Sequence, residues 1–392
     1  MRILYHHRTQ AGDAQGIHIR EIIGSLRDSG HEVNEVALVL SDAPKPATGD
    51  ADAKPSMLSR LKDNLPDLFR ELAEIGYNLV GFFKLLSAAR RIKPDFIYER
   101  YALFNFSGVL VARVLKIPVI LEVNSPLAME QADLGQQKLG GLARRAERWI
   151  CNHATVVITV STPLKQILVD MGVEAERIVV MSNGVDPERF HGRRDAGDAV
   201  RARFGLDGKR VVGFVGWVRE WHGIEDLVRG MPDWPADLGD VHLLVIGDGP
   251  ARADIEAAAR AVGVAERVHV TGAVEHAQIV EYLAAIDVAL QPAATTYASP
   301  MKIFEYLAMA KPVVSVDQGN TREILTEGEN ALFFPPGDRP AFVDAVKDMF
   351  SDQQRLERMS EAARNTIFNR EYLWRRNAEK VVDLAAAHRP HD

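Results

Sequence analysis

The sequence has very little cysteine: Cys151 is the one such residue among 392. A single cysteine excludes an intramolecular disulfide framework and any metal site that needs several thiolates. Cys151 directly follows Trp149 and Ile150 at the end of a helical pattern. A thiol in such a position is usually buried and unreactive, so we expect no nucleophile there.

Uninterrupted apolar runs of membrane-spanning length, about 20 residues, are also absent. Residues 1–5 predict a short strand, and His6, His7 and Arg8 interrupt it before the apolar region of a signal peptide could form. We therefore expect a cytoplasmic protein. A position at the inner face of the membrane stays open.

The chain lacks a large excess of either charge, since 47 Lys and Arg face 54 Asp and Glu and the formal net charge is -7. General nucleic-acid binders are strongly basic, so no nucleic-acid partner is expected. The Gly-x-Gly-x-x-Gly fingerprint is absent too, which disfavours a nicotinamide cofactor. Asp50-Ala51-Asp52 is similar to a metal-binding Asp-x-Asp motif, but it lies in a Pro- and Ala-rich stretch with no apolar strand before it. We interpret it as solvated linker and expect no metal site.

Short runs rich in Val, Ile and Leu alternate with helical patterns along the whole chain, which predicts an α/β fold with parallel sheets. The expected strands lie at 2–5, 33–40, 96–99, 119–123, 155–160, 178–181, 211–215, 242–246, 268–271, 288–291, 312–316 and 331–334. The chain exceeds the size at which single cores stop growing. We therefore expect two doubly wound domains, 1–185 and 186–365, joined at a polar segment, and a helix over about 366–392.

In each expected domain a loop follows the first strand. Both loops lie at the sheet edge where open parallel sheets bind ligands. In the first, Gly16 permits close approach of the backbone to a bound group, and His18 lies in the following helical turn. A plain strand–helix turn explains this loop equally well. The second loop again contains a glycine, Gly216, and its Arg219 offers a forked donor that matches phosphate oxygens.

Trp217 and Trp221, in that second loop, are either core anchors or walls of a cleft. The next turn, after the strand at 242–246, contains Asp248 and Gly249. Asp248 either accepts a hydrogen bond from a ligand hydroxyl or caps the following helix. Main-chain groups around Val274, at a neighbouring strand end, are placed to pair with the edge of a base.

The segment from Tyr297 onward has the most specific local pattern. Ser299 and Pro300 predict an N-cap and a first helical residue. The backbone N–H groups that follow, from Met301 to Ile303, would suit a phosphate together with the helix dipole. Lys302 adds a cation and Glu305, one turn on, an acceptor for sugar hydroxyls. An ordinary cap with a solvated Lys–Glu pair is the alternative.

Several motifs occur in order: Ser182-Asn183-Gly184-Val185-Asp186, Gly247-Asp248-Gly249-Pro250, Thr271-Gly272-Ala273-Val274, and Phe304-Glu305-Tyr306-Leu307-Ala308 followed by Lys311-Pro312-Val313-Val314. As a set they resemble the family-4 glycosyltransferases, retaining enzymes of the GT-B fold, over most of the chain. A subgroup with Trp221-His222-Gly223 and Ser299-Pro300-Met301-Lys302 is especially similar. The resemblance implies two Rossmann-like domains facing across a cleft, with the C-terminal helix packed back on the first domain.

Some family positions differ in this chain. The usual pair of glutamates separated by seven residues is reduced to Glu305, because Tyr297 occupies the first position. Trp217 and His222 stand where many members have a diphosphate-binding arginine and lysine. Arg219 and Lys302 are our candidates for that charge.

A histidine common after the fourth strand is also missing, from the stretch 121–126. In its absence, Asn124 or Glu122 is the candidate near the sugar. His18 is a further candidate on the same acceptor side. The resemblance implies that a nucleotide-diphosphate sugar places its base near Val274 and its ribose on Glu305. The diphosphate would lie on Met301 and Lys302, closed over by Arg219 and the Gly16 loop.

The implied reaction needs no protein nucleophile, no metal and no cofactor beyond the donor itself, because the departing phosphate helps to deprotonate the acceptor. The catalytic candidates are thus Arg219, Lys302, Glu305 and Asn124, and the expected acceptor is a glycan or a lipid-linked sugar. A GT-B-like nucleotide-sugar epimerase and a non-catalytic GT-B partner subunit stay open as alternatives.

The acceptor side includes a long helical pattern over residues 57–93, in which apolar residues alternate with Lys and Arg. Such a helix suits contact with an anionic membrane or a lipid-linked acceptor. The alternative is a helix packed in the core with ordinary solvated charges.

Overall fold

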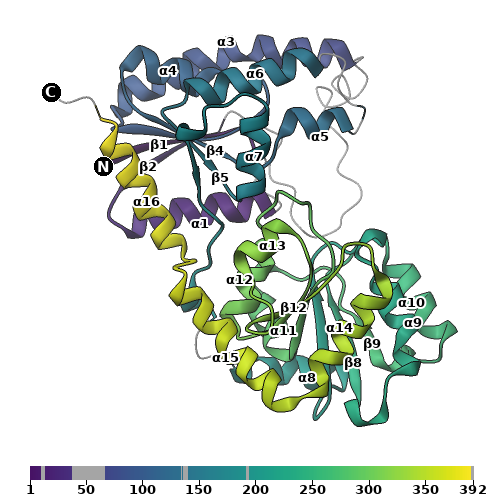
Figure 1. Cartoon of the computed structure of the whole chain (residues 1–392). Coiled ribbons are helices and arrows are strands. Elements are labelled where there is room, and N and C mark those ends of the chain that lie inside the picture. Colours follow the sequence, from purple (N-terminus) through teal and green to yellow (C-terminus); the bar gives the residue numbers. More distant parts are fainter. Residues whose placement is uncertain (10–13, 38–66, 134, 136–139, 191–193, 390–392) are drawn as a thin grey trace. The chain divides into compact units, whose positions relative to one another are not determined.

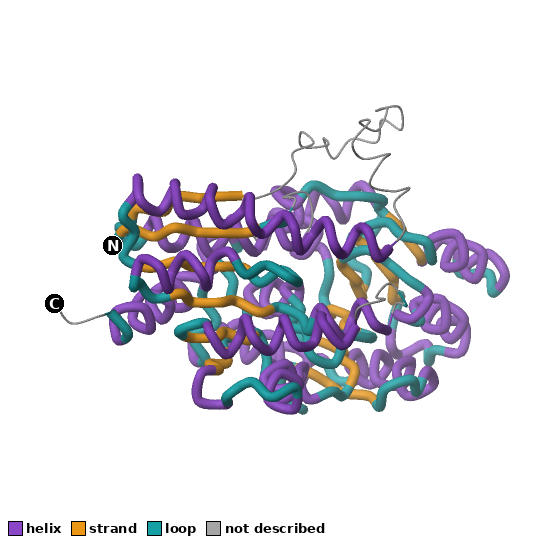
Figure 2. The backbone as a smooth tube through the Cα atoms, turned by 90° about the horizontal axis from the view of Figure 1, so that it is seen from above, coloured by secondary structure: helices purple, strands orange, loops and turns teal. Residues whose placement is uncertain are grey.

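The structure is a computed structural model that describes residues 1–9, 14–37, 67–133, 135, 140–190 and 194–389. Asp50 and Asp52 therefore lie outside the described residues. The chain divides into two compact units: Met1–Ser182 together with Trp374–Asp392, and Asn183–Leu373. Each unit contains a six-stranded parallel sheet with helices on both faces, so the expected α/β, doubly wound GT-B architecture is confirmed (Figures 1 and 2).

The sheet of the first unit has the strand order β2-β1-β3-β4-β5-β6, and every pairing is parallel. Its strands are β1 (Arg2–His7), β2 (Glu32–Ala37), β3 (Phe96–Arg100), β4 (Val119–Val123), β5 (Val156–Thr159) and β6 (Ile178–Val180). Its helices are α1 (Ala14–Asp28), α3 (Asp67–Ile92), α4 (Ser107–Leu115), α5 (Leu127–Asp133), α6 (Gly140–His153), α7 (Thr162–Asp170) and α16 (Trp374–Ala387).

Helices α1 and α16 pack together on one side of this sheet, and α3, α4 and α6 cover the other (Figure 1). The α1 side is closed by Ala378, Val381 and Ala385 of α16, which are fully buried beside sheet residues such as Tyr5 and Tyr98. The last helix of the chain is therefore part of the core of the first unit.

The sheet of the second unit has the order β12-β11-β10-β7-β8-β9, again all parallel. Its strands are β7 (Arg210–Val215), β8 (Val241–Ile246), β9 (Val268–Val270), β10 (Val288–Gln291), β11 (Val313–Val316) and β12 (Ala331–Phe334). Its helices are α8 (Asp198–Phe204), α9 (Ile224–Gly230), α10 (Arg252–Ala261), α11 (Ile279–Ala285), α12 (Met301–Ala308), α13 (Gly319–Ile324), α14 (Arg339–Ser351) and α15 (Gln353–Asn369). One apolar cluster covers each face of this sheet.

All twelve expected strands are present, with ends that differ by a few residues. The first strand continues to His7, so that His6 is buried rather than exposed in a loop. The turn expected around Gly16 is helical, because α1 begins at Ala14 and includes Gly16, and His18 lies in the helix as expected. The long helix expected over 57–93 is α3, whose described part starts at Asp67.

Cys151 is fully buried, and burial raises the pKa of its thiol well above the ordinary value, as expected for an unreactive side chain. Among the described residues, no helix combines the length and the apolar character needed to span a membrane.

Candidate functional site

The carboxyl ends of β7 and β8 approach each other so closely that only glycine fits. A Cβ on Gly247 would lie 2.2 Å from the carbonyl oxygen of Gly216, and one on Gly249 would lie 2.1 Å from that of Val218. All three glycines have positive φ angles. The Val218 N–H donates to the Asp248 carbonyl at 2.8 Å, which fixes the two turns together. The surface at the ends of β7 and β8 is therefore formed by backbone atoms.

Lys302 lies against this backbone surface, beside Gly216. A Cβ on Gly216 would be 3.2 Å from the Lys302 Nζ, and the same Nζ lies 4.3 Å from the centre of the Phe214 ring. Burial lowers the pKa of Lys302 to about 8, although the Glu305 carboxylate one turn away acts to raise it. The structure therefore holds a partly desolvated cation where β7 ends, which favours an anionic ligand.

The N-terminus of α12 differs from the expectation in one respect. Ser299 does not cap the helix, and Pro300 is the N-cap rather than the first helical residue. The Ser299 side chain accepts instead from the Asn183 N–H at 3.2 Å, and Asn183 Nδ2 donates to the Ser299 carbonyl at 2.7 Å. No side chain caps the helix, so its positive end is presented at Met301 and Lys302. The Ile303 N–H is less accessible, because it already donates to the Pro300 carbonyl at 3.1 Å.

Two side chains that the sequence did not single out hold this edge of the sheet in place. The Tyr306 hydroxyl accepts from the Val215 N–H at 2.9 Å and donates to the Leu290 carbonyl at 3.3 Å, so it joins β7 and β10. Asn320 Nδ2 donates to the carbonyls of Thr295 and Ala298, at 3.0 and 2.7 Å, and fixes the loop before α12. Tyr306 could have been found, since it follows Glu305 in a recognised motif; Asn320 had no such signal. The buried Tyr297 lies in the loop that Asn320 holds.

His222 is a buried, neutral side chain. Its Nδ1 accepts from the Arg219 N–H at 3.0 Å, and its ring stacks on Trp221 with 3.9 Å between centres. Burial and the nearby Lys302 ammonium lower the pKa of His222 to about 3, so the imidazole carries no charge at physiological pH. His222 therefore supplies shape and not charge at this position.

The remaining residues of this edge are more exposed. Trp217 and Trp221 have exposed fractions of 60% and 49%, so they are not core anchors. Asp248 does not cap α10, which has Ala251 at its N-cap; its Oδ1 accepts from the Gly249 N–H at 2.8 Å. Arg219 is exposed, and Val274 is half-buried against the core. The Arg219 side chain is thus accessible to a ligand.

The first unit contains a second polar cluster at the ends of β3 and β4. The Glu122 carboxylate accepts from Arg100 Nη1 at 2.9 Å, from the Tyr98 hydroxyl and from Asn124 Nδ2. His18 Nδ1 lies 3.5 Å from the same carboxylate. Burial acts to raise the pKa of Glu122, but His18, Arg100 and the two hydrogen bonds bring it below the ordinary value. The structure thus brings together His18, Glu122 and Asn124, with Gly16 in the same helix as His18.

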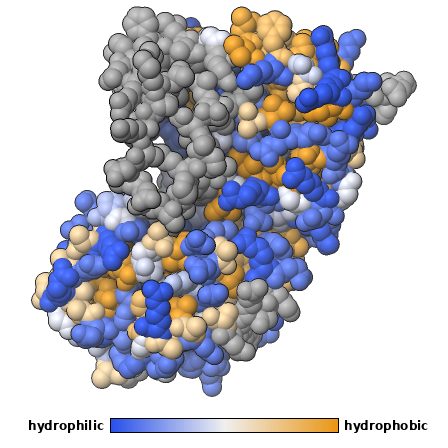
Figure 3. Space-filling view, turned by 180° about the vertical axis from the view of Figure 1, so that it is seen from behind, coloured by the Kyte–Doolittle hydropathy of each residue, from blue (hydrophilic) through white to orange (hydrophobic). Residues whose placement is uncertain are grey.

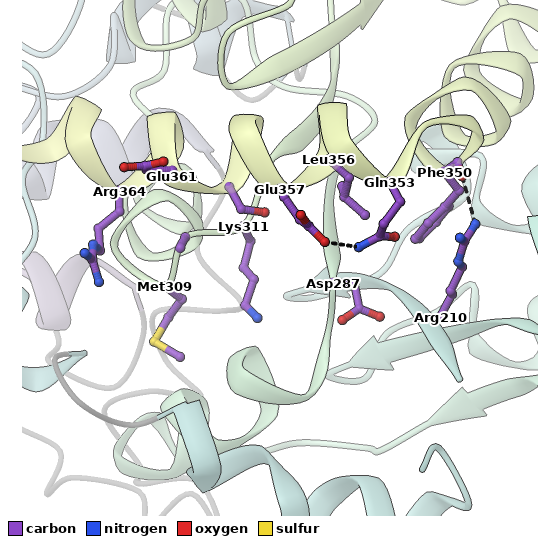
Figure 4. A pocket seen from close by; sticks show the side chains of 12 residues that line it. Arg210, Asp287, Met309, Lys311, Phe350, Gln353, Leu356, Glu357, Glu361 and Arg364 are labelled. Atoms are coloured by element: carbon purple, nitrogen blue, oxygen red, sulfur yellow. Dashed lines mark hydrogen bonds between the residues drawn. The ribbon is translucent and has the colours of Figure 1, made fainter. Parts of the chain in front are cut away.

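A pocket of about 630 Å³ lies elsewhere in the second unit, among the starts of β7, β10 and β11 and helix α15 (Figure 4). Several of its charged groups already have partners. Arg210 donates to the carbonyls of Leu238 and Phe350, and Lys311 Nζ donates to that of Ile286 at 2.6 Å. This pocket is therefore a weaker candidate than the opposite sheet edge. In the described part of the chain, no group of three or more His, Cys, Asp or Glu side chains is placed to hold a metal.

Comparison with known families covers both units. Residues 15–189 match the family described as Glycosyltransferase Family 4, and residues 209–352 match Glycosyl transferases group 1. The chain is 26% identical over 361 residues to a GDP-mannose-dependent alpha-mannosyltransferase of Mycobacterium tuberculosis, covering 90% of this chain and 87% of that protein. It is 25% identical over 262 residues to the alpha-D-kanosaminyltransferase of Streptomyces kanamyceticus, covering 66% of this chain and 68% of the other.

The fold is also found in solved structures. HepE of Anabaena in complex with UDP superimposes with a TM-score of 0.75 at 18% identity, covering 99% of this chain and 100% of that chain. WaaG, a glycosyltransferase of lipopolysaccharide biosynthesis, superimposes with a TM-score of 0.62 at 16% identity, covering 97% and 99%. At these identities the likeness concerns the fold.

Proposed function

The chain belongs to the GT-B glycosyltransferases, and from that premise we propose that it is a retaining enzyme. It moves a sugar from a nucleotide-diphosphate sugar to a glycan or glycolipid acceptor, without a metal ion. The observation that carries this proposal is the position of Lys302, held over Gly216 at the uncapped N-terminus of α12.

The donor diphosphate lies against this positive region of the second unit. The α12 dipole, the Met301 and Lys302 N–H groups and the Lys302 ammonium are fixed in place before the reaction. Charge that develops on the departing diphosphate then meets donors that need no reorganisation, which is commonly the largest catalytic effect. The exposed Arg219 supplies a second, mobile cation. These groups take the part that a metal ion plays in other sugar transferases.

The rest of the donor lies along the same edge. Glu305, one helical turn from Lys302, accepts from the ribose hydroxyls, and main-chain groups at Val274 pair with the base. The Gly247-Asp248-Gly249 turn lets the donor approach the backbone, since no Cβ stands between them.

The polar cluster of the first unit is our candidate for binding the acceptor. Glu122 already accepts from Tyr98, Arg100 and Asn124, so it acts as a positioning residue. By accepting from Asn124 Nδ2, it leaves the Asn124 carbonyl oxygen to accept from a sugar hydroxyl. His18 is held beside the same carboxylate.

The test is a thermal-shift screen of the full chain with UDP-, GDP- and ADP-sugars, because a ligand specific for the folded state raises the melting temperature. One nucleotide class should give a saturable increase. Glu305→Gln should weaken that donor by about 10- to 100-fold, since a hydrogen bond to a charged group contributes roughly 1.5–3 kcal/mol. Glu361→Gln, at an exposed position of α15, is the matched control and should bind as the wild type does. No shift with any donor would contradict the proposal.

Turnover separates the remaining alternatives. With donor and acceptor present, NMR of the product should show the same anomeric configuration as the donor, and inversion would contradict the retaining assignment. Conversion of the donor to an epimer without acceptor would instead identify a GT-B-like epimerase. Failure to bind any nucleotide sugar, together with unchanged cellular glycans in Glu305→Ala, would favour a non-catalytic partner subunit.

A further inference from the structure

One face of the first unit combines exposed apolar side chains with cations. Leu79, Val80 and Phe83 of α3 have exposed fractions of 66%, 49% and 60%, and Leu110 and Val114 of α4 have 37% and 53%. Helices α3 and α4 pack against each other, so these side chains belong to neighbouring helices of one layer. Leu142 of α6, in the same layer, is 45% exposed (Figure 1). We call the surface of α3, α4 and α6 the basic–apolar face.

The helices separate a buried side from this outer side. Gly81, Leu85 and Ala89 of α3 are buried toward the sheet, while Leu79 and Phe83, one turn apart, are not. Helix α3 thus packs in the core and still exposes large apolar groups. Figure 3 shows hydrophobic and hydrophilic residues interspersed on the visible face of this unit. Exposed apolar patches of this kind usually mark an interaction surface.

The charge of the face is predominantly positive, although the first half of α3 also contains Asp67, Glu71 and Glu74. Segments 76–93, 107–116 and 140–153 contain the nine cations Lys84, Arg90, Arg91, Lys93, Arg113, Lys116, Arg144, Arg145 and Arg148. Their one acidic residue is Glu147, which is fully buried. The whole chain has a net charge of -7, so the cations are concentrated here against the overall balance. Among the described residues, none of the nine forms an ion pair with an acidic side chain.

A pocket at the edge of the face has the same character. It has a volume of about 610 Å³ and is lined by Arg144, Arg145 and Arg148 together with Met129, Ile167 and Met171. Asp170 also lines it. Guanidinium groups beside apolar side chains suit a phosphate attached to an acyl chain better than a simple anion.

We infer that the basic–apolar face docks on an anionic lipid bilayer, with α3 and α4 lying in the interface. Leu79, Phe83, Leu110 and Val114 enter the boundary between headgroups and acyl chains, while the lysines and arginines contact lipid phosphates. The complementarity of charge selects a bilayer over an apolar protein surface, because a face with this excess of cations would be costly to bury against apolar protein. This inference is independent of the sugar donor.

The first experiment is sedimentation of the full chain with vesicles. Vesicles of phosphatidylcholine that contain phosphatidylglycerol should carry the protein down, and pure phosphatidylcholine should not. Each cation near an anionic surface is worth roughly a fivefold change in partitioning, so Lys84→Gln/Arg90→Gln/Arg91→Gln should lower it by about 100-fold. The control Arg260→Gln/Arg358→Gln/Arg364→Gln changes three exposed cations of the second unit and should partition as the wild type does.

The second experiment measures insertion. Because Cys151 is buried, Phe83→Cys can be labelled selectively with an environment-sensitive fluorophore. Its emission should shift to the blue with anionic vesicles, whereas a label at Phe368→Cys, an exposed position in the second unit, should not respond. Equal binding to neutral vesicles, unchanged partitioning of the α3 triple variant, or no shift at position 83 would overturn the inference. So would binding to heparin or to an acidic protein without binding to vesicles.

Discussion

Replacing Lys302 by methionine should make the unliganded protein more stable while it abolishes recognition of the donor diphosphate. The Lys302 ammonium is held beside Phe214 and over Gly216, where it has lost part of its hydration. Methionine has a similar length and packs over the same apolar ring without a charge. The stability and the binding site thus make opposite demands on this position.

The magnitude follows from the pKa. Lys302 has a pKa of about 8 in the folded chain against an ordinary value of 10.5. This difference corresponds to at most about 3 kcal/mol, and because the side chain is only half-buried we expect about 1–3 kcal/mol. Between pH 8 and 10.5 the unfolded chain binds more protons, so the wild type gains stability as pH rises through that window. The advantage of Lys302→Met is therefore complete below pH 8 and disappears by about pH 10.5.

The assay is thermal and urea unfolding of both proteins from pH 6.5 to 10.5, with and without donor. A unit of this size gains about 2–4 °C per kcal/mol, so a shift of several degrees is expected at pH 7. Lys311→Met is the matched control, since Lys311 Nζ donates to the Ile286 carbonyl at the other sheet edge. That variant should lose about 1–3 kcal/mol and keep donor binding.

Two results would refute this reasoning. A pH-independent difference between wild type and Lys302→Met would show that the charge of Lys302 is not destabilised by burial. A variant that keeps the full donor-induced increase in melting temperature would show that the diphosphate lies elsewhere.

Three further predictions concern stability. Burial raises the pKa of Glu147 to about 7 from 4.5, so the folded chain binds the extra proton between these values and loses up to about 3 kcal/mol as pH rises through them; Glu147→Gln should remove this loss in urea unfolding at pH 5 and 8. Gly249→Ala should cost roughly 2 kcal/mol or more, because its Cβ would meet a backbone oxygen at 2.1 Å, whereas Gly263→Ala, with nothing within 4 Å, should cost less by thermal unfolding. Arg100→Met leaves the Glu122 carboxylate buried without its cation and should cost about 3–5 kcal/mol, with partial recovery in Arg100→Met/Glu122→Gln.

The strands could be predicted from the sequence because a buried parallel strand is a local apolar run with clear ends. β4, β10 and β12 have the predicted bounds. The positions of Gly216, Gly249 and Lys302 at one sheet edge follow from the same alternation, since the loops after parallel strands share an edge.

Side-chain partners could not be predicted in this way, because they depend on residues far apart in the sequence. Ser299 has the local pattern of an N-cap, yet its partner is Asn183, 116 residues earlier. The sequence shows His222 at a position where a charged residue is common, but burial and the nearby Lys302 ammonium keep the imidazole neutral. The Asp248 carboxylate similarly accepts a hydrogen bond from the adjacent Gly249 N–H.

The contribution of α16 to the first unit has a consequence for synthesis on the ribosome. The face of the first sheet that receives Ala378, Val381 and Ala385 cannot be covered until residues beyond Leu373 have emerged. The ribosome must first translate the roughly 190 residues of the second unit, which takes about 10–40 s at 5–20 residues per second. During that interval Ile19, Ile22 and Ile23 of α1 lack their final neighbour. The nascent first unit is thus exposed to aggregation for longer than its own length would suggest. A chaperone would bind the uncovered apolar surface of α1 and the first sheet.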